Sequence, residues 1–190
     1  MIELTPQQGE RLLRLARETI ARRLGVGRGP DREILDDEAM QQRCGCFVTL
    51  KLAGQLRGCI GNLEPVGPLG EAVMRNAESA AFHDHRFTPL TPEELVRVNL
   101  DISILTPAVR LDYRDGADLC RRLRPGIDGV ILRADGAQAT FLPQVWEQLP
   151  NPADFLDHLC LKAGLPKSAW HGGRLEVSVY QVCSFSERQQ

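Results

Sequence analysis

The sequence lacks an excess of charge of either sign, and it lacks any long apolar run. Its 190 residues include 23 basic and 25 acidic side chains, a formal net charge of -2. This balance produces no overall field that would attract a polyanion, which disfavours a nucleic-acid partner. No segment approaches the length of about 20 apolar residues that a bilayer requires, and residues 1–6 do not resemble an export signal. We therefore expect a cytoplasmic protein with no membrane span.

The cysteine and histidine spacings typical of zinc sites are also missing. The sequence has no Cys-x-x-Cys pair and no His-Glu-x-x-His helix. The six cysteines are scattered, at Cys44, Cys46, Cys59, Cys120, Cys160 and Cys183. In a reducing compartment such cysteines are free thiols, and most pack as small apolar residues. We predict no metal site and no bound cofactor.

Length and composition predict one domain. A chain of 190 residues that is 43% hydrophobic can bury one substantial core and is short for two. Residues 1–190 are therefore predicted to form a single domain. Residues 5–8 have the pattern of a helix-capping box, and helical spacing of leucines continues from there up to Gly25. Residues 91–94 repeat the capping pattern and predict a second, short helix.

The predicted elements occur twice in the order hairpin, helix, strand. The first unit comprises residues 47–60, 68–81 and 100–104, and the second comprises residues 129–142, 151–164 and 175–179. The turn of the second hairpin is expected at residues 135–136. Short hairpin connections require antiparallel neighbours. The pattern therefore predicts an α+β fold in which both units form one mainly antiparallel, barrel-like sheet flanked by helices.

The segment LRGCIG, residues 56–61, places a cysteine between glycines. In an extended strand Arg57 and Cys59 point to the same face, where the guanidinium would lower the pKa of the thiol and hold an anionic group. Gly58 and Gly61 would then let a substrate approach closely. In the structural alternative, Cys59 is a small packed residue, the glycines form a bulge, and Arg57 pairs with a surface carboxylate.

Residues 83–87, His-Asp-His-Arg-Phe, form the second candidate segment. Either histidine would suit a base for Cys59 or a metal ligand. Asp84 and Arg86 share a face in an extended chain, and a charge-assisted hydrogen bond between them would pin this loop above Phe87.

Gln144 and Trp146 follow the second hairpin directly. An indole ring with one polar group at this position either lines a pocket or closes the core. The residues alone do not decide between these two roles.

Several short motifs together resemble the AMMECR-one domain family, whose microbial members include the AmmeMemoRadiSam system protein A. They are FVTL at 47–50, LRGCIG at 56–61, ISIL at 102–105, FLPQVW at 141–146 and KAGL at 162–165. The likeness runs from about Thr5 to Phe185. It implies an α+β domain built from two similar units. It also implies partners, since genes of this family often lie beside, or are fused to, those of Memo-type and radical S-adenosylmethionine proteins.

The family pattern carries onto individual positions of this sequence. These are Arg57, Gly58, Cys59, Gly61, Asp84, Arg86, Phe87, Pro143, Gln144 and Trp146. It does not carry onto His83 or His85, which weakens any mechanism with a histidine base.

Two functional hypotheses follow, with a remote third. In the first, the protein is an enzyme or pathway subunit with Cys59 as nucleophile, Arg57 and Asp84 as its catalytic partners, and an unidentified small-molecule or protein substrate. The residues expected to bind that substrate are Gly58, Gly61, Arg86, Gln144 and Trp146. In the second, the same surface is a non-catalytic binding or adaptor module. Nucleic-acid binding is the third.

Overall fold

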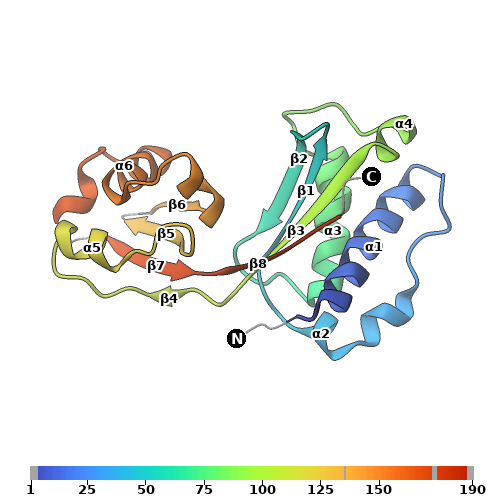
Figure 1. Cartoon of the computed structure of the whole chain (residues 1–190), viewed down its shortest axis with the longest axis horizontal. Coiled ribbons are helices and arrows are strands. Elements are labelled where there is room, and N and C mark those ends of the chain that lie inside the picture. Colours follow the sequence, from blue (N-terminus) through green and yellow to red (C-terminus); the bar gives the residue numbers. More distant parts are fainter. Residues whose placement is uncertain (1–3, 135, 173–174, 188–190) are drawn as a thin grey trace. The chain divides into compact units, whose positions relative to one another are not determined.

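The chain is divided into two compact units in a computed structural model that describes residues 4–134, 136–172 and 175–187 (Figure 1). One unit holds residues 1–105 and 183–190, and the other holds residues 106–182. Each unit has its own sheet and its own buried cluster of apolar side chains. That the whole chain behaves as a single domain stays a prediction. None of the described helices is both long enough and apolar enough to cross a membrane.

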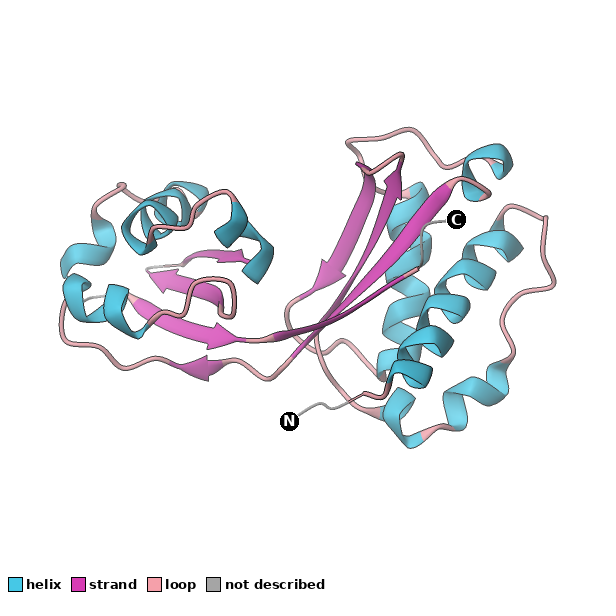
Figure 2. Cartoon of the chain, viewed as in Figure 1, coloured by secondary structure: helices cyan, strands magenta, loops and turns pink. Residues whose placement is uncertain are grey.

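The first unit is a four-stranded sheet covered by helices (Figure 2). Its strands are β1 (Cys46–Leu52), β2 (Gln55–Asn62), β3 (Val98–Leu105) and β8 (Val182–Ser186). They lie in the order β2-β1-β3-β8, and β1 is antiparallel to both of its neighbours. The helices are α1 (Pro6–Arg23), α2 (Glu38–Gln41), α3 (Leu69–Phe82) and α4 (Pro92–Leu95), with a 3-10 helix at Arg32–Asp36.

The capping boxes begin both helices that they predicted. The Thr5 side chain accepts a hydrogen bond from the backbone of Gln8, and the Gln8 side chain accepts one from the backbone of Thr5. α1 ends at Arg23, close to the expected end at Gly25. The apolar stripe of α1 packs on α3 and β3, and that of α3 packs on β1, whose Cys46, Val48 and Leu50 are buried. The alternate residues of β1 therefore lie on the sheet face opposite these helices.

The second unit repeats this arrangement. Its strands are β4 (Val109–Arg110), β5 (Gly129–Ala134), β6 (Ala137–Phe141) and β7 (Glu176–Tyr180). They lie in the order β4-β7-β5-β6. Its helices are α5 (Gly116–Arg122) and α6 (Pro152–Lys162), with 3-10 helices at Pro143–Glu147 and Ala169–Gly172. Leu132, Phe155 and Leu159 are fully buried in its core.

The α+β class and the repeated hairpin, helix and strand are confirmed, but the expected single sheet is corrected. The described strands form two sheets whose orders correspond, β2-β1-β3-β8 and β6-β5-β7-β4. In each, the first hairpin strand has its hairpin partner on one side and the strand that follows the unit's own helix on the other. β1 and β5 thus have both edges hydrogen-bonded within their own units, and neither needs a strand of the other unit as a partner. Asp135 of the predicted turn lies outside the described residues.

Candidate functional site

Cys59 lies on β2, an edge strand, on the face opposite the helices. Leu50 of β1 pairs with Gly58 and Lys51 pairs with Leu56, so Arg57 is the extra residue of a β-bulge. The bulge shifts the register by one residue and sets Cys59 directly opposite Thr49. The structural alternative for this segment expected the glycines to form a bulge; a bulge is present, but its extra residue is Arg57 and not a glycine.

The two glycines of the segment are each in contact with other parts of the first unit. A Cβ on Gly58 would lie 2.2 Å from the carbonyl oxygen of Ala80 in α3. A Cβ on Gly61 would lie 2.3 Å from the ring of Phe47 and 2.4 Å from the carbonyl oxygen of Cys46. The space beside both glycines is therefore filled by the protein itself, which gives each a packing reason. Their part in substrate binding stays a prediction.

The backbone of Cys59 is bound on its outer side by two side chains. Asp84 accepts a hydrogen bond from the Cys59 amide through Oδ2 at 2.9 Å, and Arg86 Nη2 donates to the Cys59 carbonyl at 3.3 Å. An unpaired edge strand exposes such groups to other chains. The side chains of Asp84 and Arg86 therefore take the place of a neighbouring strand at this one residue.

Asp84 is a buried carboxylate, 4% exposed. Besides the Cys59 amide, it accepts hydrogen bonds from Arg86 Nε at 2.9 Å, Arg86 Nη2 at 2.7 Å and the Arg86 amide at 3.2 Å. The Arg86 guanidinium, helped by these amides and opposed by burial, holds the pKa of Asp84 well below its usual range. Asp84 and Arg86 thus form the ion pair that the sequence suggested, while His83 and His85 beside them are exposed.

The Arg57 guanidinium is engaged by a carboxylate from α4. Its Nε and Nη2 donate to the two oxygens of Glu94, both at 2.8 Å, and the side chain is 11% exposed. The bidentate hydrogen bond lowers the pKa of Glu94. Phe87 contacts both cations, with its ring centre 5.9 Å from Arg57 and 5.5 Å from Arg86. Arg57 therefore pairs as the structural alternative expected, and its action on the Cys59 thiol stays a prediction.

The Cys59 sulfur itself is half-buried and accepts a hydrogen bond from Thr49 Oγ1 at 3.2 Å. Thr49 also lies directly opposite Asp101 of β3, and Asp101 is bound by Lys51 Nζ at 2.6 Å. Sequence reasoning missed Thr49, Lys51, Asp101 and Glu94. A strict count back from the hairpin turn would have set Thr49 opposite Gly58, because the glycines suggest a bulge but do not indicate that Arg57 is its extra residue.

No group of three or more histidine, cysteine or acidic side chains suited to a metal ion occurs among the described residues. A hollow of about 930 Å³ in the first unit is lined by α1 and β3 residues such as Leu13, Arg17 and Asn99, and not by Cys59. The Cys59 site is therefore a surface of side chains on a sheet face and is not part of this hollow.

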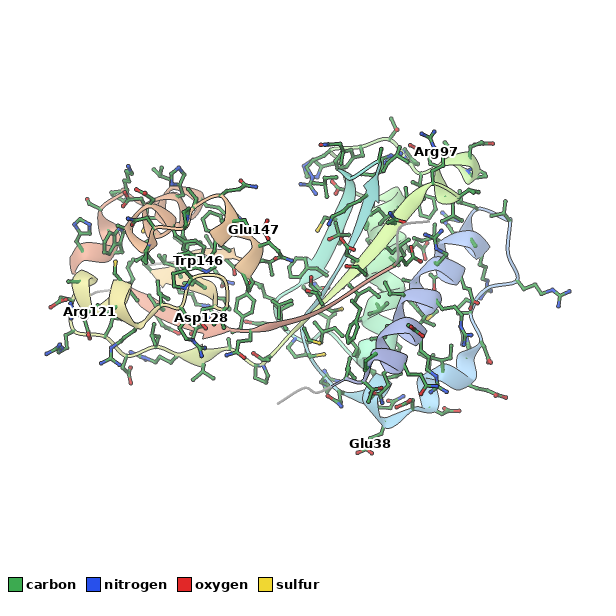
Figure 3. All side chains as sticks on the ribbon, viewed as in Figure 1. Glu38, Arg97, Arg121, Asp128, Trp146 and Glu147 are labelled. Atoms are coloured by element: carbon green, nitrogen blue, oxygen red, sulfur yellow. The ribbon has the colours of Figure 1, made fainter. Side chains whose placement is uncertain are left out.

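Gln144 and Trp146 belong to the second unit, where the structure places Trp146 in the core (Figure 3). Its ring is 3% exposed and stacks on Phe155 with centroids 3.7 Å apart and planes 7° apart. Its Nε1 donates to the Asp128 carbonyl at 2.7 Å. Gln144 is exposed. These contacts match the core-closing role of Trp146, and substrate binding by either residue stays a prediction.

Replacing Trp146 with phenylalanine is expected to destabilise the second unit by about 2 kcal/mol. The change removes part of the stacked ring and leaves the buried Asp128 carbonyl without its donor. Urea unfolding measures the loss. Gln144→Ala is the control, because an exposed side chain should change the free energy of unfolding by no more than about 0.5 kcal/mol. Equal stability of both variants would contradict the core role of Trp146.

Comparison with known proteins gives a consistent set of relatives. A family model described as AMMECR1 matches residues 13–185. The chain is 39% identical over 188 residues to a protein from Methanothermobacter thermautotrophicus, covering 97% of this chain and 96% of the relative. It is 36% identical over 198 residues to a protein from Thermofilum pendens, covering 98% and 93%.

A crystal structure of an uncharacterized protein from Pyrococcus horikoshii has a similar fold. The two superpose with a TM-score of 0.85 at 30% sequence identity, over 98% of this chain and 94% of that chain.

Proposed function

Because the chain belongs to the AMMECR1 family, whose name specifies no reaction, we propose from the geometry of the site that Cys59 is the nucleophile of a thiol-dependent reaction. The observation that carries this proposal is the half-buried Cys59 sulfur, which accepts the Thr49 hydroxyl on the sheet face that the helices leave uncovered. A donor to the sulfur favours the thiolate, which is the reactive form of cysteine.

The surrounding ion pair supports this role by fixing the nucleophile. Asp84 and Arg86 bind the amide and the carbonyl of Cys59, and these hydrogen bonds hold the backbone of the nucleophile in place. Asp84 and Arg86 are then positioning residues, because both bind the backbone of Cys59. The Arg86 pKa is raised chiefly by its hydrogen bond to Asp84. Arg57 contacts Phe87 of the same loop and is bound to Glu94 of α4.

The reaction class follows from the nucleophile. The Cys59 thiol gives its proton to water, the sulfur forms a bond to an electrophilic carbon of the substrate, and the leaving group departs with its bonding electron pair. We propose that the substrate is a small molecule or a protein, and that it belongs to a pathway shared with Memo-type and radical S-adenosylmethionine proteins. The likeness of LRGCIG and its neighbouring motifs to the family supports these partners.

Alkylation of each cysteine across a pH series tests the proposal, with mass spectrometry to locate every adduct. Cys183 and Cys120 are internal controls, because they are also half-buried and burial raises the pKa of both thiols. We expect the midpoint of the pH-rate profile to lie lower for Cys59 than for either control. A Cys59 midpoint at or above theirs would contradict a reactive thiolate.

A second candidate function, a non-catalytic adaptor, is favoured by the pairing inside the site. Arg57 and Arg86 are each bound to a carboxylate, and the space beside Gly58 and Gly61 is filled. Such a surface suits a protein partner that covers it without chemistry. A pull-down with Memo-type and radical S-adenosylmethionine proteins separates the two functions. An adaptor captures a partner equally well as wild type and as Cys59→Ser, whereas failure of both to capture either partner would contradict it.

A further inference from the structure

Three neighbouring strands place a row of polar side chains on the face of the first sheet opposite its helices. Cys59 on β2, Thr49 on β1 and Asp101 on β3 lie directly opposite one another in the register. Lys51, two residues after Thr49 on the same face, binds Asp101 at 2.6 Å. Side chains directly opposite on one face of an antiparallel sheet are about 5 Å apart at Cβ, so members of the row affect each other.

Two acceptors compete for the proton of the Thr49 hydroxyl, the Cys59 sulfur on one side and the Asp101 carboxylate on the other. A hydroxyl has one proton to donate, and a carboxylate is a stronger acceptor than a thiol. The Asp101 carboxylate, however, is bound by the Lys51 ammonium, and Thr49 donates to the Cys59 sulfur at 3.2 Å. The ion pair between Lys51 and Asp101 therefore leaves the hydroxyl proton for the sulfur.

We propose that Thr49 is the positioning residue of the Cys59 site, with a hydroxyl that orients the sulfur and stabilises its thiolate, and that Lys51 keeps Asp101 from drawing that proton away. This inference rests on the proposed function, because it assigns the group that prepares Cys59 to react. It adds residues on β1 and β3 to a site otherwise formed by β2 and the loop after α3.

The charged side chains around Cys59 are paired with one another, so a neutral donor has to stabilise the Cys59 thiolate. Asp84 and Arg86 pair with each other from the loop after α3, Lys51 and Asp101 pair across β1 and β3, and Arg57 pairs with Glu94 of α4. Each cation is offset by its own carboxylate, so none acts on the sulfur with its full charge. The Thr49 hydroxyl is the hydrogen-bond donor that the described residues offer to the sulfur.

The experiment compares pH-rate profiles of Cys59 alkylation in the full-length chain for wild type, Thr49→Val and Thr49→Ser. Valine keeps the shape of threonine without the hydroxyl. We expect it to raise the Cys59 midpoint by about one unit, which lowers the thiolate fraction about tenfold on the acid side. Serine keeps the donor and should restore the wild-type midpoint. Asp101→Asn should lower the midpoint, because it removes a negative charge beside the thiolate.

The outcomes separate this inference from the proposed function. The position of the wild-type midpoint relative to Cys183 tests whether Cys59 is activated at all. The difference between Thr49→Val and wild type tests Thr49 alone, whatever the wild-type value. Equal midpoints for valine, serine and wild type, in variants whose thermal unfolding matches wild type, would overturn the role of Thr49. If valine unfolds the protein, a serine midpoint that departs from wild type would overturn it.

Discussion

Replacing Gly58 with alanine is expected to destabilise the first unit by about 3 kcal/mol, at the upper end for overpacking a core. The added methyl group would lie 2.2 Å from the Ala80 carbonyl oxygen and 3.1 Å from its carbon. Both atoms belong to the backbone of α3, which cannot rotate away as a side chain would. β2 or α3 must therefore move, and the movement disturbs the register that places Cys59. Urea unfolding, followed by helical circular dichroism, measures the loss.

Gly67→Ala is the matched control for this change. It introduces the same methyl group in the same unit, but the atom it meets is the end of the flexible Arg75 side chain at 3.2 Å. We expect it to cost less than about 1 kcal/mol. If both variants lose the same free energy, the close approach of α3 to Gly58 is not what fixes this strand.

Replacing Asp84 with asparagine is expected to cost about 2 to 3 kcal/mol near neutral pH and to expose the Cys59 amide. Oδ1 accepts hydrogen bonds from the amide and Nε of Arg86, and Oδ2 accepts from the Cys59 amide and Arg86 Nη2. In either orientation of an asparagine side chain, its NH2 group would face N–H donors of Cys59 or Arg86 in place of an accepting oxygen. Hydrogen exchange at the Cys59 amide should accelerate, while exchange in the second unit should not change.

The pH dependence of this cost has a definite sign. The Asp84 pKa is depressed in the folded protein, chiefly by Arg86, so its contribution is complete well above the unfolded value of about 3.9. The contribution is lost as the pH falls through and below that value toward the folded pKa. The stability gap between wild type and Asp84→Asn should therefore shrink between about pH 5 and pH 3. A gap that stays constant over this range would contradict an ionised, paired Asp84.

Much of the fold could be predicted because its signals are local. The capping boxes at Thr5 and Thr91 depend on residues three positions apart, and both begin helices in the structure. The repeated order of hairpin, helix and strand was also visible. How the strands divide into sheets was not, since the same alternating pattern serves one sheet or two. The pairing of β1 and β5 within their own units settled that question.

The candidate site was predictable only where its residues are neighbours in the chain. Asp84 and Arg86 were paired from the sequence because they are two positions apart, and LRGCIG was recognised as a unit. Arg57 and Glu94 are 37 positions apart, and their ion pair requires α4 to lie beside the bulge. Thr49 was missed for a similar reason, since a single extra residue at the bulge decides whether it faces Gly58 or Cys59.

Competition for a limiting amount of alkylating reagent tests the central claim most directly. The native chain at neutral pH receives less than one equivalent of iodoacetamide, and peptide mass spectrometry locates the first adduct. The account predicts that the adduct forms on Cys59 ahead of Cys120 and Cys183, which share its half-buried exposure. A first adduct on Cys120 or Cys183, or an even distribution among the three, would contradict a reactive Cys59.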